Sequence, residues 1–107
     1  PLAADPTIAY IWRKEHNKYL RRIRNKHIEQ TKNSPFNTYH HVGLPPFPIC
    51  VPSIQAINSV LYPEDHDFLY MCARPDNSEY HNFAKNHFEH SANAAAFHAW
   101  LNKRKIY

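Results

Sequence analysis

The sequence contains a single glycine, two cysteines and no long apolar run. One glycine is too few for the glycine-rich loop that cradles nucleotide or cofactor phosphates. Cys50 and Cys72 form no Cys-x-x-Cys pair and do not have the spacing of a zinc site. They could form one disulfide, but a single pair does not show whether the protein lies in an oxidising compartment. No apolar stretch approaches the roughly 20 residues of a membrane span. We therefore expect no cofactor, no metal and no membrane-spanning helix within these residues.

The motifs of common catalytic sites are missing as well. No serine stands in a Gly-x-Ser-x-Gly context, which removes the usual sign of an activated nucleophile. A carboxylic acid that acts as a general acid needs apolar surroundings that raise its pKa. All five glutamates instead have polar sequence neighbours: Glu15, Glu29, Glu64, Glu79 and Glu89. Nothing in these motifs therefore identifies a catalytic residue within the chain.

Three histidines near the C-terminus raise the question of a metal site. His87 and His90 stand three residues apart and could face one ion from a helix. No carboxylate or cysteine stands near them at a recognised ligand spacing. We therefore interpret His81 as a groove or hydrogen-bonding histidine rather than a ligand.

Positive charge is present and unevenly distributed. The net charge is +4, with nine further histidines, and much of it lies between Arg13 and Lys26. Such a run suits an anionic partner, which could be nucleic acid, an anionic membrane surface or an anionic glycan. A solvated basic helix face is the simpler use of the run. No named nucleic-acid motif accompanies it, so the residues alone indicate only an anionic partner.

The most unusual stretch runs from Ser34 to Pro52. It holds five of the nine prolines and the only glycine, yet it is rich in apolar and aromatic residues. Proline fixes φ and removes a backbone donor, which excludes a helix interior or a central strand. Long irregular segments within compact domains are usually functional. The stretch therefore predicts either the wall of a groove or a stiff connector that covers a core.

The remaining pattern predicts an α+β fold with several short helices, a small antiparallel hairpin and a long C-terminal helix. Asp5 is expected as the N-cap of the first helix, with Pro6 at its first position, and Ser53 as the N-cap of the third helix, which Pro63 ends. Phe68 to Ala73 has strand length, and Tyr80 to Phe83 can return beside it. The second and last helices are expected over 18–29 and 85–103.

The last helix has two apolar faces. Phe88, Ala92, Ala95 and Ala99 line one of them, flanked by Ala96 and Trp100, and Phe97 and Leu101 fall on the other. The pattern thus allows contacts on two sides.

An ordered set of motifs gives the sequence a family resemblance. Asp5-Pro6-Thr7 is followed by Ser34-Pro35-Phe36-Asn37-Thr38-Tyr39, by Gly43-Leu44-Pro45-Pro46, by Pro52-Ser53, by Phe68-Leu69-Tyr70, by His81-Asn82-Phe83 and by His90. This order resembles the YceG-like endolytic murein transglycosylases over nearly the whole chain. Phe36 and Phe47 depart from the family's usual tyrosine and glycine, and the hairpin turn lacks the family's glycines.

The resemblance implies a fold and a reaction. Residues 1–107 would be a single domain, the C-terminal part of the family's catalytic domain. The family cleaves the bond between N-acetylmuramic acid and N-acetylglucosamine without water, leaving a 1,6-anhydro end. Its catalytic glutamate lies in an upstream helix, so this chain would carry no catalytic residue. The substrate-binding residues implied here are Asp5, Thr7, Asn37, Thr38, Tyr39, His81 and Phe83.

The resemblance also implies partners and a location. Peptidoglycan strands would be the substrate, cell-wall synthesis proteins would be partners, and no nucleic acid would be bound. The chain opens at Pro1 without an initiator methionine, so we expect a piece of a longer protein, anchored upstream in the bacterial inner membrane and facing the periplasm. A basic glycan- or nucleic-acid-binding module without catalysis is the alternative. Family members have also been labelled aminodeoxychorismate lyases, but this chain lacks a glycine-rich cup for pyridoxal phosphate.

Overall fold

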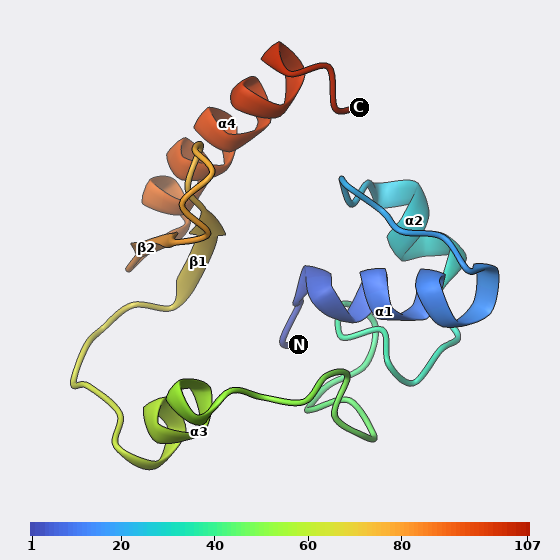
Figure 1. Ribbon diagram of the computed structural model, residues 1–107, viewed down its shortest axis with the longest axis horizontal. Coiled ribbons are helices and arrows are strands. Elements are labelled where there is room, and N and C mark those ends of the chain that lie inside the picture. Colours follow the sequence, from blue (N-terminus) through green and yellow to red (C-terminus); the bar gives the residue numbers. More distant parts are fainter. The chain divides into compact units, whose positions relative to one another are not determined.

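The computed structural model describes all residues from 1 to 107 and confirms the α+β class (Figure 1). The chain divides into two compact units, Pro1–Ala56 and Ile57–Tyr107. No helix combines the length and apolar character that crossing a membrane requires. The elements in order are α1 (Asp5–His16), α2 (Asn25–Gln30), α3 (Ile54–Leu61), β1 (Tyr70–Ala73), β2 (His81–Ala84) and α4 (His87–Lys103).

Helix α1 begins one residue before the predicted position. Asp5 is already helical, and Ala4 occupies the N-cap in an extended conformation without a side-chain cap. The prediction of Asp5 as the N-cap is therefore wrong. The Asp5 carboxylate lies in the first turn, where it interacts favourably with the positive end of the helix dipole. Ile8 and Ile11 form the buried apolar stripe, and Asn17 ends the helix in the left-handed region at φ 51°.

Helix α2 is much shorter than the predicted helix over 18–29. The residues from Lys18 to Arg24 are irregular, and only Asn25–Gln30 is helical. Lys18, Arg21 and Arg22 would stand three or four residues apart on such a helix, where like charges repel. No acidic residue lies within that part to offset the repulsion. The apolar spacing of Leu20 and Ile23 was therefore a misleading signal.

The proline-rich stretch contains turns and bends but no helix or strand, as its composition predicts. Its second half is open to solvent: Val42, Leu44 and Phe47 are more than two thirds exposed, at 86%, 83% and 71%. Helix α3 follows it with the predicted cap, since the Ala56 amide donates to Ser53 Oγ at 3.1 Å.

The second unit contains a two-stranded antiparallel sheet, as predicted, with Tyr70 opposite Ala84 and Ala73 opposite His81. The connecting turn closes through the Arg74 amide, which donates to the Tyr80 carbonyl at 3.0 Å. Glu79 adopts φ 65°, a left-handed conformation that glycine adopts without strain.

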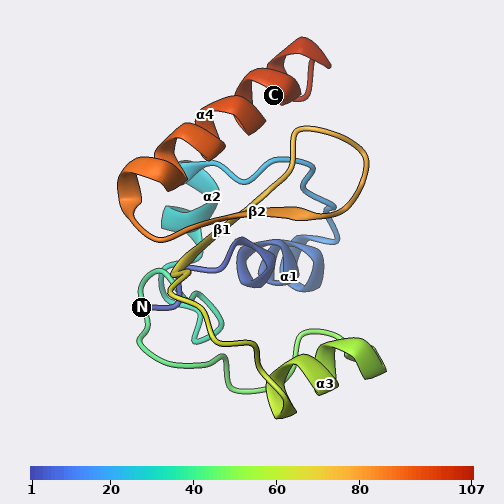
Figure 2. The same cartoon turned by 90° about the vertical axis from the view of Figure 1, so that its left-hand side faces the viewer.

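Helix α4 packs against the hairpin (Figures 1 and 2). Its N-cap is Asn86, whose Oδ1 accepts from the Glu89 amide at 2.8 Å. Only one of the two apolar faces is packed: Phe88 is 84% exposed, and Ala92, Ala95 and Ala99 in line with it are exposed. Leu101 is buried and Phe97 half-buried on the opposite face. That face also carries His90 and Asn93, which are both half-buried. Because these side chains are polar, the apolar pattern of the sequence does not indicate their burial.

Candidate substrate-binding site

The residues before and within the start of α1 are joined to the proline-rich stretch by hydroxyl groups. Thr7 Oγ1 and Thr38 Oγ1 lie 2.8 Å apart, and both side chains are almost fully buried. The Ala4 amide donates to Thr38 Oγ1 at 3.0 Å, and the Ala3 amide donates to the Thr38 carbonyl at 2.9 Å. Two segments more than thirty residues apart in sequence are therefore fixed against each other.

Asp5 and Tyr39 form the polar surface above this buried pair. The Tyr39 hydroxyl donates to Asp5 Oδ1; Asp5 is exposed and Tyr39 half-buried. Burial of the phenol, followed by its hydrogen bond to Asp5 and the charge of Asp5, raises the pKa of Tyr39 above its usual range. The phenol therefore stays protonated and keeps its hydrogen bond to Asp5, while the carboxylate and the phenol oxygen both retain lone pairs that can accept from a further donor.

Asn37 is fully buried and uses its whole amide group. Its Nδ2 donates to the Ile28 carbonyl at 2.9 Å and to Thr31 Oγ1 at 3.1 Å. Its Oδ1 accepts from the amides of Tyr39 and His40, at 2.9 and 3.1 Å. A side chain with four such bonds is satisfied internally. In this structure Asn37 thus shapes the loop that presents Tyr39.

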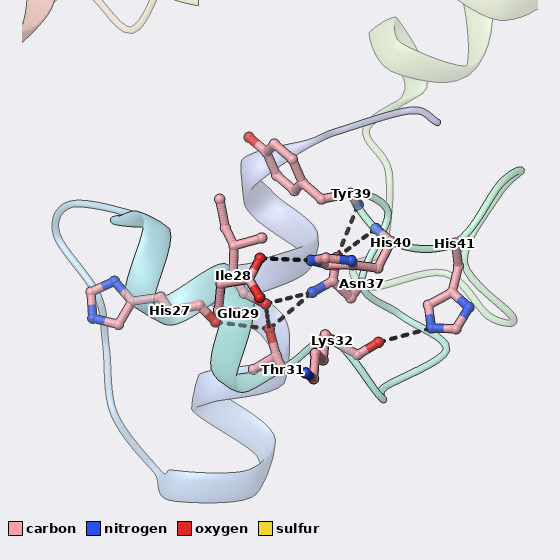
Figure 3. A network of polar contacts seen from close by, with 9 residues as sticks. All are labelled: His27, Ile28, Glu29, Thr31, Lys32, Asn37, Tyr39, His40 and His41. Atoms are coloured by element: carbon pink, nitrogen blue, oxygen red, sulfur yellow. Dashed lines mark hydrogen bonds and ion pairs between the residues drawn. The ribbon is translucent and has the colours of Figure 1, made fainter.

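The same network ties the loop to α2 (Figure 3). Thr31 Oγ1 donates to the His27 carbonyl at 2.8 Å, and His41 Nε2 lies 3.1 Å from the Lys32 carbonyl. His40 Nε2 lies 3.1 Å from Glu29 Oε1 at the surface. The polar bonds around Asn37 therefore continue from α2 to the exposed end of the loop.

The arrangement offers a carboxylate and a phenol oxygen as acceptors, held by buried residues. Thr7, Asn37 and Thr38 are each at most 3% exposed, so Asp5 and Tyr39 are the two predicted residues of this unit that reach solvent. The carboxylate and the phenol oxygen can accept from hydroxyl and amide N–H groups, such as those of a sugar.

His81 and Phe83 lie in the second unit, on strand β2. They are two residues apart, so they share one face of the strand, and both are exposed. Phe83 lines an open groove of about 570 Å³. Its ring lies 5.7 Å from the ring of Phe68, another lining residue. The other lining residues are Asn58, Ser59, Tyr62, Pro63, Glu64 and His66.

The two histidines at the start of α4 surround a tyrosine. Tyr70 stacks on His90 with ring centroids 5.0 Å apart and meets the edge of His87 at 6.1 Å. His90 Nδ1 is buried without a hydrogen-bond partner. No group of three or more histidines, cysteines or carboxylates has a geometry that could hold a metal ion.

Sequence reasoning missed the supporting residues of the first unit. Thr31 and the Ile28 carbonyl hold Asn37, and Glu29 pairs with His40. Thr31 carries no sequence signal, since it lies in a polar stretch after α2. Asp5 and Tyr39 were named as site residues, but their pairing depends on a fold that brings distant segments together.

Comparisons with known proteins place the chain in a family. A family model described as "YceG-like family" matches residues 1–96. The chain is 32% identical over 100 residues to the endolytic murein transglycosylase of Bacillus subtilis (strain 168). The matched region covers 87% of this chain and 26% of that protein. A second relative, the endolytic murein transglycosylase of Streptococcus pneumoniae serotype 2 (strain D39), is 35% identical over 68 residues, 64% of this chain and 12% of the relative.

A solved structure shows the same fold. The crystal structure of a yceG-like protein from Listeria monocytogenes matches with a TM-score of 0.69 and 33% identity, over 85% of this chain and 27% of that one. The chain therefore belongs to the YceG-like family. It spans about a quarter of the length of the Bacillus relative and of the Listeria structure.

Proposed function

We propose that this chain is the substrate-side part of an endolytic murein transglycosylase. The observation that carries the proposal is the joining of the Asp5-Pro6-Thr7 segment to the Ser34–Tyr39 segment through the Thr7–Thr38 hydroxyl pair. Membership of a family whose relatives are named for this activity supports it. The substrate would be peptidoglycan, cut within its glycan strands between N-acetylmuramic acid and N-acetylglucosamine.

The residues of this chain then divide into two roles. Asp5 and Tyr39 contact sugar hydroxyl or acetamido groups, and Thr7, Asn37 and Thr38 position them. In the second unit, Phe83 stacks on a sugar face and His81 forms a hydrogen bond to the glycan. The quadrupole of an aromatic ring favours the weakly positive C–H groups of a sugar.

The acid that cleaves the bond would come from a part of the protein outside residues 1–107. All five glutamates of the chain are exposed, whereas a proton donor needs a desolvated carboxyl group. One such acid would protonate the glycosidic oxygen and then take the proton of the muramyl 6-hydroxyl, which closes the 1,6-anhydro ring. Because the attacking hydroxyl belongs to the substrate, a second carboxylate is not required.

The proposal extends to the rest of the protein. Residues 1–107 would form one domain of a longer chain, anchored in the cell membrane with this domain on its outer side, among proteins of cell-wall synthesis. Purified peptidoglycan incubated with the longer protein should release strands with anhydro-muramic ends, detected by mass spectrometry. The 107-residue chain alone should release none. Reducing ends in place of anhydro ends would contradict the proposal.

A further inference from the structure

The segment from Arg13 to Lys26, here called the basic segment, concentrates positive charge on the first unit. Seven lysines and arginines stand against one acidic residue, Glu15. The Arg74–Asp76 ion pair and the His40–Glu29 contact lie outside the segment. The exposed cations of the segment are Arg13, Lys14, Lys18, Arg21, Arg24 and Lys26.

The positive charge of the segment affects a buried histidine of the unit. His27 is buried beside the segment, and its pKa is lowered by burial, then by the charges of Lys26 and Arg24. Lys26 and Arg24 are thus close enough for their charges to disfavour a proton on the imidazole. The six exposed cations of the segment, with one acidic residue among them, present a net positive charge to solvent.

The segment is held at both ends rather than loose. Trp12 Nε1 donates to the His27 carbonyl at 3.3 Å, and the two rings meet edge to face at 5.1 Å. The Lys18 amide donates to the Trp12 carbonyl at 3.4 Å. Leu20 and Ile23 are half-buried, so the loop turns its aliphatic residues inward. The charged side chains are thereby displayed on a fixed backbone.

Tyr19 adds an aromatic group to this surface. It is 74% exposed, and the Arg13 guanidinium carbon lies 5.3 Å from its ring centroid. An exposed tyrosine among basic side chains is typical of segments that lie at the headgroup level of a membrane. The cations are spread over the end of α1, the connecting loop and the start of α2, which suits an extended anionic surface.

We propose that the basic segment docks this chain on an anionic phospholipid surface, with its lysines and arginines on lipid phosphates and Tyr19 at the interface. The contact is independent of glycan cleavage, because it uses none of the residues assigned to the substrate. Each lysine or arginine near an anionic membrane contributes about 1 kcal/mol. Loss of three cations should therefore weaken binding on the order of 100-fold.

The test compares two charge-matched triple variants of the 107-residue chain. Lys18→Gln, Arg21→Gln and Arg24→Gln neutralise the segment, and Lys32→Gln, Lys103→Gln and Lys105→Gln remove the same charge from exposed positions elsewhere. Binding is measured by co-sedimentation with phosphatidylglycerol–phosphatidylcholine vesicles and with pure phosphatidylcholine vesicles. A parallel titration uses soluble polyphosphate.

The proposal predicts binding to the anionic vesicles that is lost at about 0.5 M salt and in the first variant, and kept in the second. Equal loss in both variants would mean that net charge alone is responsible and would overturn the assignment. Absence of binding, equal binding to neutral vesicles, or binding to polyphosphate alone would also overturn it.

Discussion

Replacing Asn37 by alanine should lower the stability of the first unit far more than replacing an exposed asparagine. The substitution removes two bonds donated to Ile28 and Thr31 and two accepted from the Tyr39 and His40 amides. Each net hydrogen bond is worth about 0.5–1.5 kcal/mol, and buried groups left without partners add to the loss. We expect a decrease of about 3–5 kcal/mol in the free energy of unfolding, since all four bonds are lost at a site that is 0% exposed.

The assay needs a probe confined to the first unit. The chain has two tryptophans, Trp12 and Trp100. In a Trp100→Phe background, the fluorescence of Trp12 reports unfolding of the first unit in urea. Asn33→Ala is the control, because Asn33 is exposed in the turn after α2. The Asn37→Ala variant should unfold at much lower urea, and the control should stay within about 0.5 kcal/mol of the parent. Equal midpoints for the two variants would refute the account of Asn37.

Three further predictions concern individual side chains. Thr38→Val should destabilise the first unit by about 1–3 kcal/mol, because the Ala4 amide loses its acceptor and Thr7 Oγ1 loses one of its two hydrogen bonds. Thr38→Ser should recover most of this loss, and urea unfolding distinguishes the two variants. Burial lowers the pKa of His27, so the imidazole binds a proton more readily in the unfolded chain than in the folded one. The contribution of neutral His27 to the free energy of unfolding is therefore fully present above about pH 6.5 and is lost as the pH falls below that value. Urea unfolding of His27→Gln should show a weaker decline over that range, and parallel curves for the two proteins would contradict this. Glu79→Gly should raise the thermal midpoint of the second unit by relieving the φ of 65°, while Glu79→Ala should not; equal midpoints would count against strain there.

Features set by neighbouring residues could be predicted from the sequence. Ser53 caps α3 as expected and Pro63 follows its end, because capping and proline effects act within a turn of the chain. The hairpin and the long last helix were also predicted within about two residues. The proline-rich stretch lacks helix and strand because proline removes donors wherever it stands.

Features that depend on distant contacts could not be predicted. The face of α4 that packs contains His90 and Asn93, whose burial follows from the position of the hairpin. The irregular backbone from Lys18 to Arg24 follows from charge repulsion that hydrophobic spacing does not register. Asn37 was predicted as a sugar ligand by resemblance. Its four internal bonds join it to groups as far away as Ile28, and no local pattern indicates them.

The central proposal is that Asp5 and Tyr39 contact the glycan strand that the longer protein cleaves. It is tested most directly by measuring anhydro-muramic ends released from peptidoglycan by the longer protein carrying Tyr39→Phe or Asp5→Asn. Both changes keep the size of the side chain and remove one polar function, so the fold should persist while kcat/KM falls about 10-fold to 100-fold, the effect of losing one or two hydrogen bonds to substrate. Release of anhydro ends at the wild-type rate by both variants would contradict the claim.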